Sequence, residues 1–420
     1  MQLLNLEKQD SIGTQIENVN SSPFASIEKA IDALKNGNFV VVVDDANREN
    51  EGDLIIPAQR ATPQNIAFMT RYTSGVICAP LHESRLNELD LPLMVANNNE
   101  SHKTAFTISV DYLHGTTTGI SAADRAATLN ALANPSCRKN DFARPGHIFP
   151  LKYSAGGVLK RPGHTEAAVD LAVLAGYSAA GAICEITKDD GSMARLPDLV
   201  EFAAQHQLPI ISIADLISYR LRTENSIYLL SEARLPTKYG EFTIYAYQSQ
   251  IDGIEHIALV KGQLQNSEDV LVRVHSECMT GDIFGSLRCD CGQQLEKAME
   301  TIEQQGLGVI IYIKGHEGRG IGLANKLKAY ELQDQGLDTV DANLNLGFKA
   351  DDRKYHIAAY ILKHLGVKSI KIVTNNPHKI NSLIEHGVKV TGRFPISLAP
   401  HEHNQGYLLT KKAKLGHLFH

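Results

Sequence analysis

The chain has 420 residues, of which 43% are hydrophobic and 21% charged, and this length and composition indicate a globular protein with two domains. The net charge of −6 argues against nucleic acid as a partner, because proteins that bind it usually carry a positive field. The 6 cysteines are too few and too unevenly placed for a disulfide scaffold, which favours a reducing compartment. The most apolar stretch, residues 167–184, contains Asp170 and fits a buried helix and strand better than a membrane span. We therefore expect a cytoplasmic protein.

Helix and strand signals alternate through the first half of the chain. Ser26 is a candidate N-cap for a helix that ends at Gly37, because apolar residues follow it at helical spacing. Residues 39–45 (FVVVVDD) predict a buried strand, and Thr62 followed by Pro63 predicts the start of another helix. Further short apolar runs continue this alternation, so the first half is predicted to be a mixed α/β domain.

The composition changes between residues 218 and 236, where a charged segment ends at a proline. We place the domain boundary near Ser226, which gives domains of residues 1–225 and 226–420. The predicted strands of the second domain are residues 241–250, 256–264, 309–313 and 369–376, and its predicted helices are residues 293–305, 321–336 and 377–386. The predicted fold class is α/β (α+β), with two mixed α/β domains in tandem, each a mixed sheet flanked by helices.

Half of the cysteines lie within residues 273–294, in the pattern C-x10-C-x-C: Cys278, Cys289 and Cys291. Thiolates are soft, anionic zinc ligands, and three of them at one point leave a coordination position open for water, as in catalytic zinc sites. No fourth Cys or His follows at zinc-finger spacing, although His275 is close in sequence. The alternative is a set of idle thiols, which their clustering makes less favourable.

Other polar clusters accompany these thiols. The segment EGRG, residues 317–320, lies between a predicted strand and a predicted helix, where glycine N–H groups and Arg319 can bind an anion. Residues 374–379 (TNNPHK) offer a hydroxyl and an ammonium group that can bind an anion in the same way. Asp351 and Arg353 lie together in a third segment and, taken alone, read as a surface ion pair. Together with zinc ligands, these clusters predict hydrolysis of a phosphorylated substrate.

The motifs RVHSEC, LRCDCG, GHEGRGIGL, LQDQGLDTVDAN, LGFKADDR and TNNP resemble those of GTP cyclohydrolase II of riboflavin synthesis, from about Leu235 to the C-terminus. The resemblance implies that the three cysteines hold Zn2+, whose activated water attacks the carbon between the two imidazole nitrogens of guanine, which leaves as formate. It implies catalytic roles for Tyr330, for Asp351 as a proton acceptor, and for Arg353. Arg353 either reacts at the α-phosphate or stabilises charge on the leaving pyrophosphate. The residues implied to bind GTP are Arg273, Val274, His275, Ser276, Glu277, Gln294, Glu317, Gly318, Arg319, Thr339, Thr374 and Lys379.

In the first domain, acidic residues follow the predicted strand FVVVVDD, at a strand end where α/β sites usually lie. Glu49, Glu51 and Asp53 repel one another unless a cation or a substrate bridges them, so they predict a magnesium site. A solvated acidic loop is the alternative.

The tetrapeptide RPGH occurs twice in this domain, ending at His147 and at His164. Two histidines in matching glycine turns indicate function, and the second turn precedes a predicted helix whose N-terminus could bind phosphate. Glu185 follows an apolar run and is either a buried base or a capping or salt-bridged acid.

The segments DDANREN, GTTTGISAADRAAT, RPGHTEAAVDL and ICEITKDDGSMAR resemble 3,4-dihydroxy-2-butanone 4-phosphate synthase over residues 26–220. The resemblance implies that ribulose 5-phosphate is rearranged and loses its fourth carbon as formate. Glu49 and His164 would ligate Mg2+ or Mn2+, and His147 and Glu185 match positions essential in that family. Asn47 departs from the commoner DDxDREN pattern without removing a ligand. The residues implied to hold substrate are Arg48, Glu49, Asp53, Arg161, Pro162, Gly163, His164, Thr165 and Glu185.

The two resemblances together predict a bifunctional riboflavin-biosynthesis enzyme. Its substrates would be ribulose 5-phosphate and GTP, with no nucleic-acid or membrane partner, and the resemblance suggests a homodimer. In one alternative only one domain is active and the other is a scaffold. In another the C-terminal half is a zinc-stapled nucleotide-binding or RNA-binding module, which the acidic net charge and the three-ligand pattern disfavour.

Overall fold

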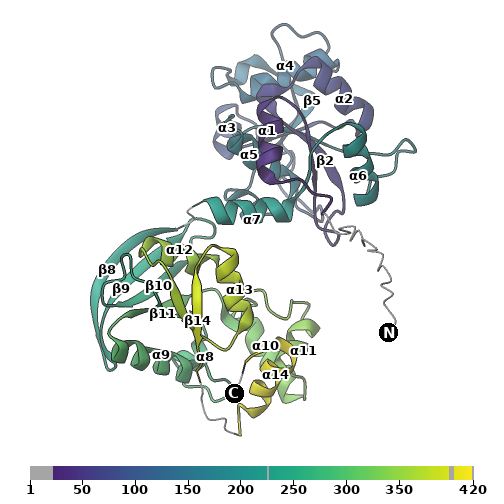
Figure 1. Ribbon diagram of the computed structural model, residues 1–420. Helices are drawn as coiled ribbons and strands as arrows, with labels where there is room; N and C mark the ends of the chain where they lie inside the picture. Colours follow the sequence, from purple (N-terminus) through teal and green to yellow (C-terminus); the bar gives the residue numbers. More distant parts are fainter. Residues whose placement is uncertain (1–21, 225–226, 397–401, 419–420) are drawn as a thin grey trace, which may run out of the picture. The chain divides into compact units, whose positions relative to one another are not determined.

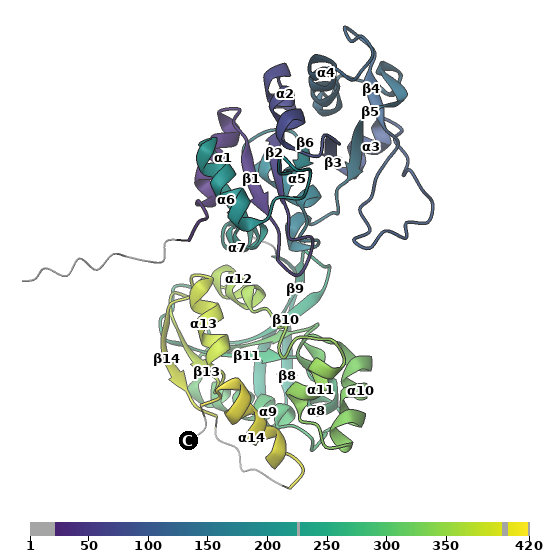
Figure 2. The same cartoon turned by 90° about the vertical axis from the view of Figure 1, so that its right-hand side faces the viewer.

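The computed structural model describes residues 22–224, 227–396 and 402–418, which form two α/β units (Figures 1 and 2). The division falls within helix α7 (Ile213–Thr223), between Leu216 and Ile217, and residues 159–161 group with the second unit. The domain boundary predicted near Ser226 lies outside the described residues. Each unit contains a seven-stranded mixed sheet with helices, which confirms the predicted fold class.

The sheet of the first unit has the strand order β4-β5-β3-β6-β2-β1-β7 and mixes parallel with antiparallel pairs. Its strands are β1 (Val40–Val43), β2 (Gly52–Pro57), β3 (Cys78–Leu81), β4 (Val110–Tyr112), β5 (Phe142–Lys152), β6 (Gly181–Glu185) and β7 (Ile210–Ser212). Its helices are α1 (Ile27–Lys35), α2 (Pro63–Tyr72), α3 (Glu83–Glu88), α4 (Ala122–Ala133), α5 (His164–Leu174) and α6 (Leu196–Gln205), with short 3-10 turns η1 (Ala58–Arg60), η2 (Lys139–Asp141) and η3 (Gly157–Leu159).

Helices cover both faces of this sheet, because its strands are apolar on both sides. On one face Val41 packs in the main core with Leu199 of α6. The other face holds α5, which approaches β6 so closely that a Cβ on Gly181 would lie 2.8 Å from the Cβ of Ala168. Side chains alternate along a strand, so Glu185, four residues after Gly181, also faces α5.

The two copies of RPGH differ in structure, and the prediction of matching glycine turns is wrong. The second copy leads into α5, with Gly163 as its N-cap. The first copy lies inside β5, in an irregularity of its pairing with β4, where Asp111 pairs with Ala143 and Val110 with Ile148. The ladder with β3 begins only at Phe149, so the copy interrupts the strand pairing and does not open a helix.

The sheet of the second unit has the strand order β14-β13-β11-β12-β10-β9-β8. Its strands are β8 (Ile227–Thr237), β9 (Gly240–Ser249), β10 (Glu255–Lys261), β11 (Val270–Ser276), β12 (Gly308–Ile313), β13 (Ile370–Val373) and β14 (Val390–Phe394). Its helices are α8 (Met279–Asp282), α9 (Cys291–Gln305), α10 (Leu323–Asp334), α11 (Thr339–Asn345), α12 (His356–His364), α13 (Pro377–Glu385) and α14 (Gln405–Leu415), with the 3-10 turn η4 (Glu317–Arg319). No helix in the described ranges of either unit combines the length and the apolar composition of a bilayer-spanning segment.

Three neighbouring strands of the second unit, β11, β12 and β13, run parallel. Helices α12 and α13 pack against one face of the sheet and α9 against the other (Figure 1). Because the carboxyl ends of parallel strands meet at one edge, the segments that follow them converge there. Cys278 lies just past β11, η4 follows β12, and Thr374 comes directly after β13. The fold thus brings together three motifs that are far apart in sequence.

The sequence analysis missed β8, which begins just after the predicted boundary. Most side chains of β8 are exposed or half-buried, so the strand lacks a regular apolar alternation. Among the described residues it pairs only with β9, and this edge position tolerates Pro236, which cannot donate a ladder hydrogen bond.

Candidate active sites

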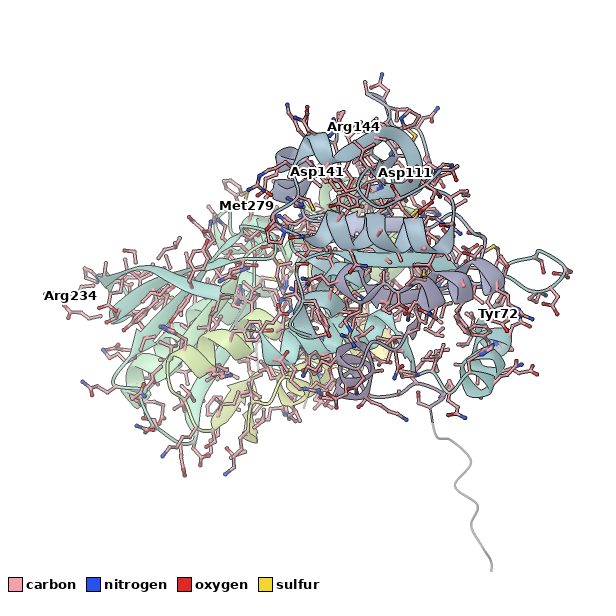
Figure 3. The ribbon with its side chains drawn as sticks, turned by 90° about the horizontal axis from the view of Figure 1, so that it is seen from above. Tyr72, Asp111, Asp141, Arg144, Arg234 and Met279 are labelled. Carbon is pink, nitrogen blue, oxygen red and sulfur yellow. The ribbon has the colours of Figure 1, made fainter. Side chains whose placement is uncertain are left out.

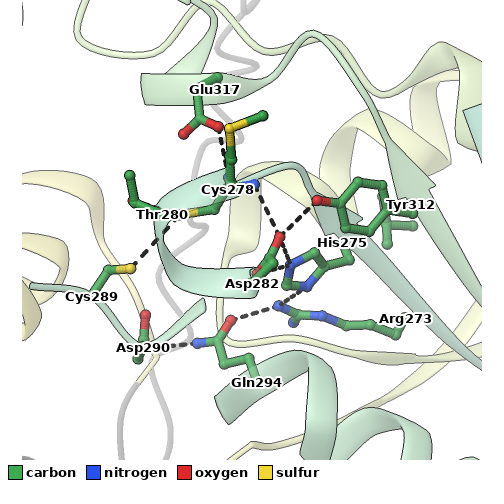
Figure 4. Close-up of polar contacts among 12 residues, drawn as sticks. Arg273, His275, Cys278, Thr280, Asp282, Cys289, Asp290, Gln294, Tyr312 and Glu317 are labelled. Carbon is green, nitrogen blue, oxygen red and sulfur yellow. Dashed lines mark hydrogen bonds and ion pairs between the residues drawn. The ribbon is translucent and has the colours of Figure 1, made fainter. Parts of the chain in front are cut away.

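Three thiols meet beyond the carboxyl end of β11, and Figure 4 shows two of them, those of Cys278 and Cys289. The Sγ atoms of Cys278, Cys289 and Cys291 all lie within 4.8 Å of one another, and those of Cys278 and Cys289 are 3.7 Å apart. A Cβ on Gly281 would lie 2.9 Å from the Sγ of Cys289 and 3.2 Å from that of Cys278, so the loop closes around the sulfurs only with glycine at this position.

The thiol trio fits a zinc ion. Thiolates about 2.3 Å from a tetrahedral zinc stand about 3.8 Å apart, which matches the sulfur spacing. Hydrogen bonds between the sulfurs lower the pKa of the Cys278 thiol and raise that of Cys289 to about 11, because one thiolate accepts from the neighbouring thiol, which then keeps its proton. A cation among them would let all three sulfurs be ionised. Within the described residues no fourth Cys, His, Asp or Glu joins the group, so one position stays open.

The loop that carries Cys278 is held by buried polar contacts (Figure 4). Asp282 accepts hydrogen bonds from the Cys278 N–H at 3.0 Å and from Nε2 of His275 at 3.0 Å. Glu317 accepts from the N–H of Met279 at 2.7 Å. His275 and Glu317, both predicted to bind GTP, therefore also support the loop of the thiol trio.

Lys326 of α10 is a functional residue that the sequence analysis missed. Its ammonium group donates to the Sγ of Cys278 at 3.2 Å, to the Thr280 hydroxyl at 2.7 Å and to Glu317. Its side chain is 9% exposed. The sequence signal was weak, since Lys326 is one of two lysines on α10 and belongs to no motif.

Two adjoining pockets lie beside the thiol trio, with volumes of about 610 and 530 Å³. Predicted residues that line the first include Glu277, Gly318, Tyr330 and Thr339. Predicted residues that line the second include Arg273, His275, Gln294, Thr374 and Lys379. Both pockets are lined by Ser276, Cys291, Arg319, Arg353 and Tyr407.

The second pocket, which we call the cation pocket, collects positive charge: Arg273, Arg319, Arg353, Lys379 and Lys411 line it. Burial, followed by the neighbouring guanidinium groups of Arg273 and Arg353, lowers the pKa of Lys379. Both terminal nitrogens of Arg319 are buried without a hydrogen-bond partner among the described residues. Unpaired, converging donors of this kind suit a polyanion such as a triphosphate.

Arg353 and Asp351 form a bidentate pair at the edge of the cation pocket, with the Nε of Arg353 2.8 Å from the Oδ1 of Asp351. Burial opposes the charge on Arg353, but Tyr355 and Asp351 raise the pKa of its guanidinium. Burial likewise favours the neutral form of Asp351, but the hydrogen bond from Arg353 lowers its pKa to about 2. Both groups are therefore ionised at neutral pH.

Val274 was predicted to bind GTP, but its side chain does not face the pockets. It is buried in the sheet core with Val272, away from the cation pocket. Only its backbone reaches the site, where its carbonyl oxygen accepts from the Nζ of Lys379 at 2.9 Å.

In the first unit, Asp44, Glu49 and His164 place ligand atoms within 4.8 Å of one another at the start of α5. The Nδ1 of His164 lies 3.3 Å from Glu49 and 3.8 Å from Asp53. Its Nε2 lies 3.1 Å from the carbonyl oxygen of Val42. A hydrogen bond donated by Nε2 directs the Nδ1 lone pair towards the carboxylates, which is the usual orientation of a metal-binding imidazole.

This carboxylate cluster fits a divalent cation. The Oδ1 of Asp53 is buried without a hydrogen-bond partner among the described residues, and burial raises the pKa of Asp53 to about 8. Burial would lower the pKa of His164, but Asp53 and Glu49 raise it to about 9. Without a metal ion the cluster thus retains protons on Asp53 and His164, and a bound cation would take the place of those protons. Asp44 was not predicted as a ligand, although it follows a buried strand, and strand ends are where sites of α/β proteins usually lie.

Other predicted residues surround this cluster. Arg48 lies 3.0 Å from both Asp44 and Glu49. Glu185 is the register partner of Asp53 and accepts a hydrogen bond from the Ser74 hydroxyl at 2.7 Å. Thr165 is buried in the first turn of α5, which Arg161, Pro162 and Gly163 precede in the chain.

His147 lies apart from the metal cluster. Its Nδ1 is 2.6 Å from Asp111, a residue of the edge strand β4 that the sequence analysis did not single out (Figure 3).

Comparisons with known proteins assign a family model to each unit. The model described as 3,4-dihydroxy-2-butanone 4-phosphate synthase matches residues 28–219, and the model described as GTP cyclohydrolase II matches residues 229–395. The chain is 55% identical over 398 residues to the bifunctional riboflavin biosynthesis protein RIBA 1, chloroplastic, of Arabidopsis thaliana, covering 94% of this chain and 73% of that protein. It is also 55% identical over 395 residues to the riboflavin biosynthesis protein RibBA of Salinispora arenicola, covering 94% of each. The solved structure of RibBX, a two-domain 3,4-dihydroxy-2-butanone 4-phosphate synthase from A. baumannii, is 34% identical with a TM-score of 0.66, covering 89% of this chain and 100% of that chain.

Proposed function

The chain belongs to the bifunctional riboflavin-biosynthesis family that joins a 3,4-dihydroxy-2-butanone 4-phosphate synthase to a GTP cyclohydrolase II, and we propose that the two clusters of residues are its two active sites. The synthase converts ribulose 5-phosphate to 3,4-dihydroxy-2-butanone 4-phosphate and formate. The cyclohydrolase hydrolyses GTP to 2,5-diamino-6-ribosylamino-4(3H)-pyrimidinone 5′-phosphate, formate and pyrophosphate. The observation that carries the second assignment is the thiol trio beside the cation pocket.

In the cyclohydrolase site, zinc held by the thiol trio supplies Lewis-acid activation of water near neutral pH. The residues of the chain bind and orient the nucleotide. Arg273, Arg319 and Lys379 hold the triphosphate in the cation pocket, and the adjoining pocket, which also reaches Cys291, holds the purine. This arrangement would hold the purine on the side of the pocket that Cys291 lines, and it lowers the entropic cost of bringing the nucleotide to the thiol trio.

Arg353 acts in this proposal by stabilising charge on the leaving pyrophosphate. Its raised pKa keeps the guanidinium protonated, and a protonated guanidinium is a poor nucleophile, so a covalent role at the α-phosphate is disfavoured. Asp351 orients Arg353 and, as an ionised carboxylate, is the proton acceptor. The Tyr330 hydroxyl, 3.1 Å from that of Thr280, is directed to the thiol side of the pocket.

In the synthase site, Mg2+ or Mn2+ held by Glu49 and His164, with Asp44 beside them, supplies polarisation of the substrate carbonyl and hydroxyl groups. The first turn of α5, including Thr165, binds the phosphate, because its N–H groups lack helical partners. Glu185 and Asp53 are placed to move protons during enediol formation, and the pKa of about 8 at Asp53 suits a proton donor.

We also propose a homodimer in a reducing, cytoplasmic compartment, where the zinc-binding cysteines stay as thiols. Exposed apolar side chains of the first unit, including Leu113 and Ile120, support a protein interface. The His147 side chain, paired with Asp111, is 41% exposed, so it is accessible to a second chain.

Formate release tests the assignment when each substrate is supplied separately. We expect formate from both, with a zinc-selective chelator stopping release from GTP only and EDTA stopping release from both. GTP binding without formate would instead support a binding module, and release from one substrate alone would support a scaffold domain.

A further inference from the structure

Helix α14 begins beyond residue 395, where the match to the GTP cyclohydrolase II model ends, yet it lines the cation pocket. Tyr407 and Lys411 of this helix, with His417 just past its end, are among the lining residues. The ammonium of Lys411 lies 4.5 Å from the ring centre of Tyr407. No residue of α14 was singled out by sequence motifs, so its role in the site comes from the fold alone.

Several contacts fix α14 against the strand ends that form the site. Lys414 lies 2.6 Å from Asp338 and 2.7 Å from Asp341, at the start of α11. Beyond the helix, the N–H of Leu418 donates to the carbonyl oxygen of Asn375 at 2.9 Å. These contacts hold the helix in place without any ligand.

Lys411 forms a buried ion pair with Asp290. The Nζ of Lys411 is 2.6 Å from the Oδ1 of Asp290, and the two side chains are 9% and 3% exposed. Asp290 stands between the ligands Cys289 and Cys291 in sequence. Burying two charges is costly, and a carboxylate left here without Lys411 would lie uncompensated beside thiolates.

A hydrogen-bonded chain continues from Asp290 to the phosphate-binding side of the pocket (Figure 4). The Oδ2 of Asp290 accepts from the Nε2 of Gln294 at 2.7 Å. The Oε1 of Gln294 accepts from the guanidinium of Arg273 at 2.5 Å. One chain of contacts, Lys411–Asp290–Gln294–Arg273, buried except at the half-buried Gln294, thus connects α14 to the thiol trio and to a cation of the GTP site.

We propose that α14 is part of the GTP site and that Lys411 is a positioning residue acting through Asp290. It fixes the segment that bears Cys289 and Cys291, and through Gln294 it fixes the guanidinium of Arg273. The inference rests on the cyclohydrolase function proposed for this unit. Without Lys411, Asp290 turns towards another cation, and both the metal ligands and the triphosphate contact lose their alignment.

K411M tests the proposal, because methionine keeps the apolar stem and removes the charge. The matched control is K412M, which makes the same change at an exposed lysine of the same helix. We expect K411M to lower kcat/KM for GTP by about 100-fold. We also expect zinc affinity, measured by chelator competition, to fall by about 10- to 100-fold. K412M should match the wild type in both measurements, and equal behaviour of the two variants would overturn the proposal.

Two further variants separate positioning from loss of folding. K411R keeps the charge and should recover most of the GTP activity, so a loss as large as that of K411M would overturn the role of the ion pair. In the D290N background, K411M should add little further loss, whereas additive losses would show that Lys411 does not act through Asp290. Formate release from ribulose 5-phosphate should stay unchanged in every variant. A failure of the proposed function would look different: the wild-type chain itself would bind no zinc and release no formate from GTP.

Discussion

At the scale of single residues, the site of the second unit depends on charged groups that are buried with a partner. Lys326 is paired with Glu317 beneath the thiol trio, and Arg353 is paired with Asp351 in the cation pocket. Removing one partner of such a pair typically costs about 3–5 kcal/mol, because the other charge stays buried and uncompensated. Side chains around the thiol trio are packed so closely that one added carbon atom, the Cβ of an alanine, should disturb the site.

We expect G281A to weaken zinc binding by at least about tenfold, since its new methyl group would press on the sulfurs of Cys289 and Cys278. Zinc content after dialysis against a graded chelator measures this. G392A is the control, because a Cβ there meets only the flexible Lys371 side chain at 3.7 Å. Normal zinc retention in G281A would contradict the tight closure of the loop.

His256 on β10 predicts a pH dependence of stability. It is 3% exposed, and burial lowers its pKa to about 4 from the ordinary 6.5. Between pH 6.5 and about 4, His256 is protonated in the unfolded chain but not in the native state. The contribution of His256 to the free energy of unfolding is therefore fully present above pH 6.5 and is lost as the pH drops towards 4. The loss attributable to this histidine is about 3 kcal/mol.

Urea unfolding of the second unit over this pH range measures the effect. H256Q can still accept the hydrogen bond that the Lys314 N–H donates to Nδ1, at 3.3 Å in the wild type, but it does not titrate. Its unfolding free energy should depend on pH less steeply, by about 1.4 kcal/mol per pH unit. An unchanged slope would show that His256 is protonated equally in both states.

At the scale of elements, the synthase site depends on how α5 packs on β6. The helix brings His164 to the sheet, and the strand ends at Glu185, the register partner of Asp53. Their close approach is possible because Gly181 has no side chain. Helix–sheet distance therefore sets the distance between the imidazole and the carboxylates.

G181A should push α5 away from β6, because its Cβ would lie 2.8 Å from that of Ala168. Overpacking of this kind costs about 1–3 kcal/mol, and the synthase activity should fall with it as His164 shifts. Thermal unfolding and formate release from ribulose 5-phosphate measure the two effects. Adding A168G removes the closest clash and should restore part of both; no restoration would place the cause elsewhere.

At the scale of the whole molecule, the two units have separate cores and separate sites. One core includes Val41 and Leu54, and the other includes Val272 and Ile311. The two groups of candidate metal ligands lie in different units, Asp44, Glu49 and His164 in the first and the thiol trio in the second. A change in one site should therefore leave the other activity intact.

C289S should lower GTP hydrolysis by at least about 100-fold and leave the ribulose 5-phosphate reaction unchanged, because it removes one zinc ligand. E49A should do the reverse, because Glu49 is a ligand of the other metal site. Each variant is the control for the other in paired formate assays. Loss of both activities in a folded variant would mean that the units are coupled.

Much of the site chemistry was visible in the sequence because short-range patterns carry it. The spacing of Cys278, Cys289 and Cys291 predicted one metal centre, which the geometry of the trio fits. The Ser26 side chain accepts from the N–H of Lys29 at 3.2 Å, as a predicted N-cap does. Caps, strands and ligand pairs a few residues apart depend on local interactions, and these are encoded locally.

The tertiary structure alone decided which distant groups meet. Lys411 is 121 residues from Asp290, and Lys326 is 48 residues from Cys278, yet both pairs are buried contacts. The same is true of His147, whose tetrapeptide resembles the one before α5 but lies in a strand. Such contacts depend on strand order and on helix packing across the sheet, which no local pattern specifies, because each results from the burial of the whole core at once.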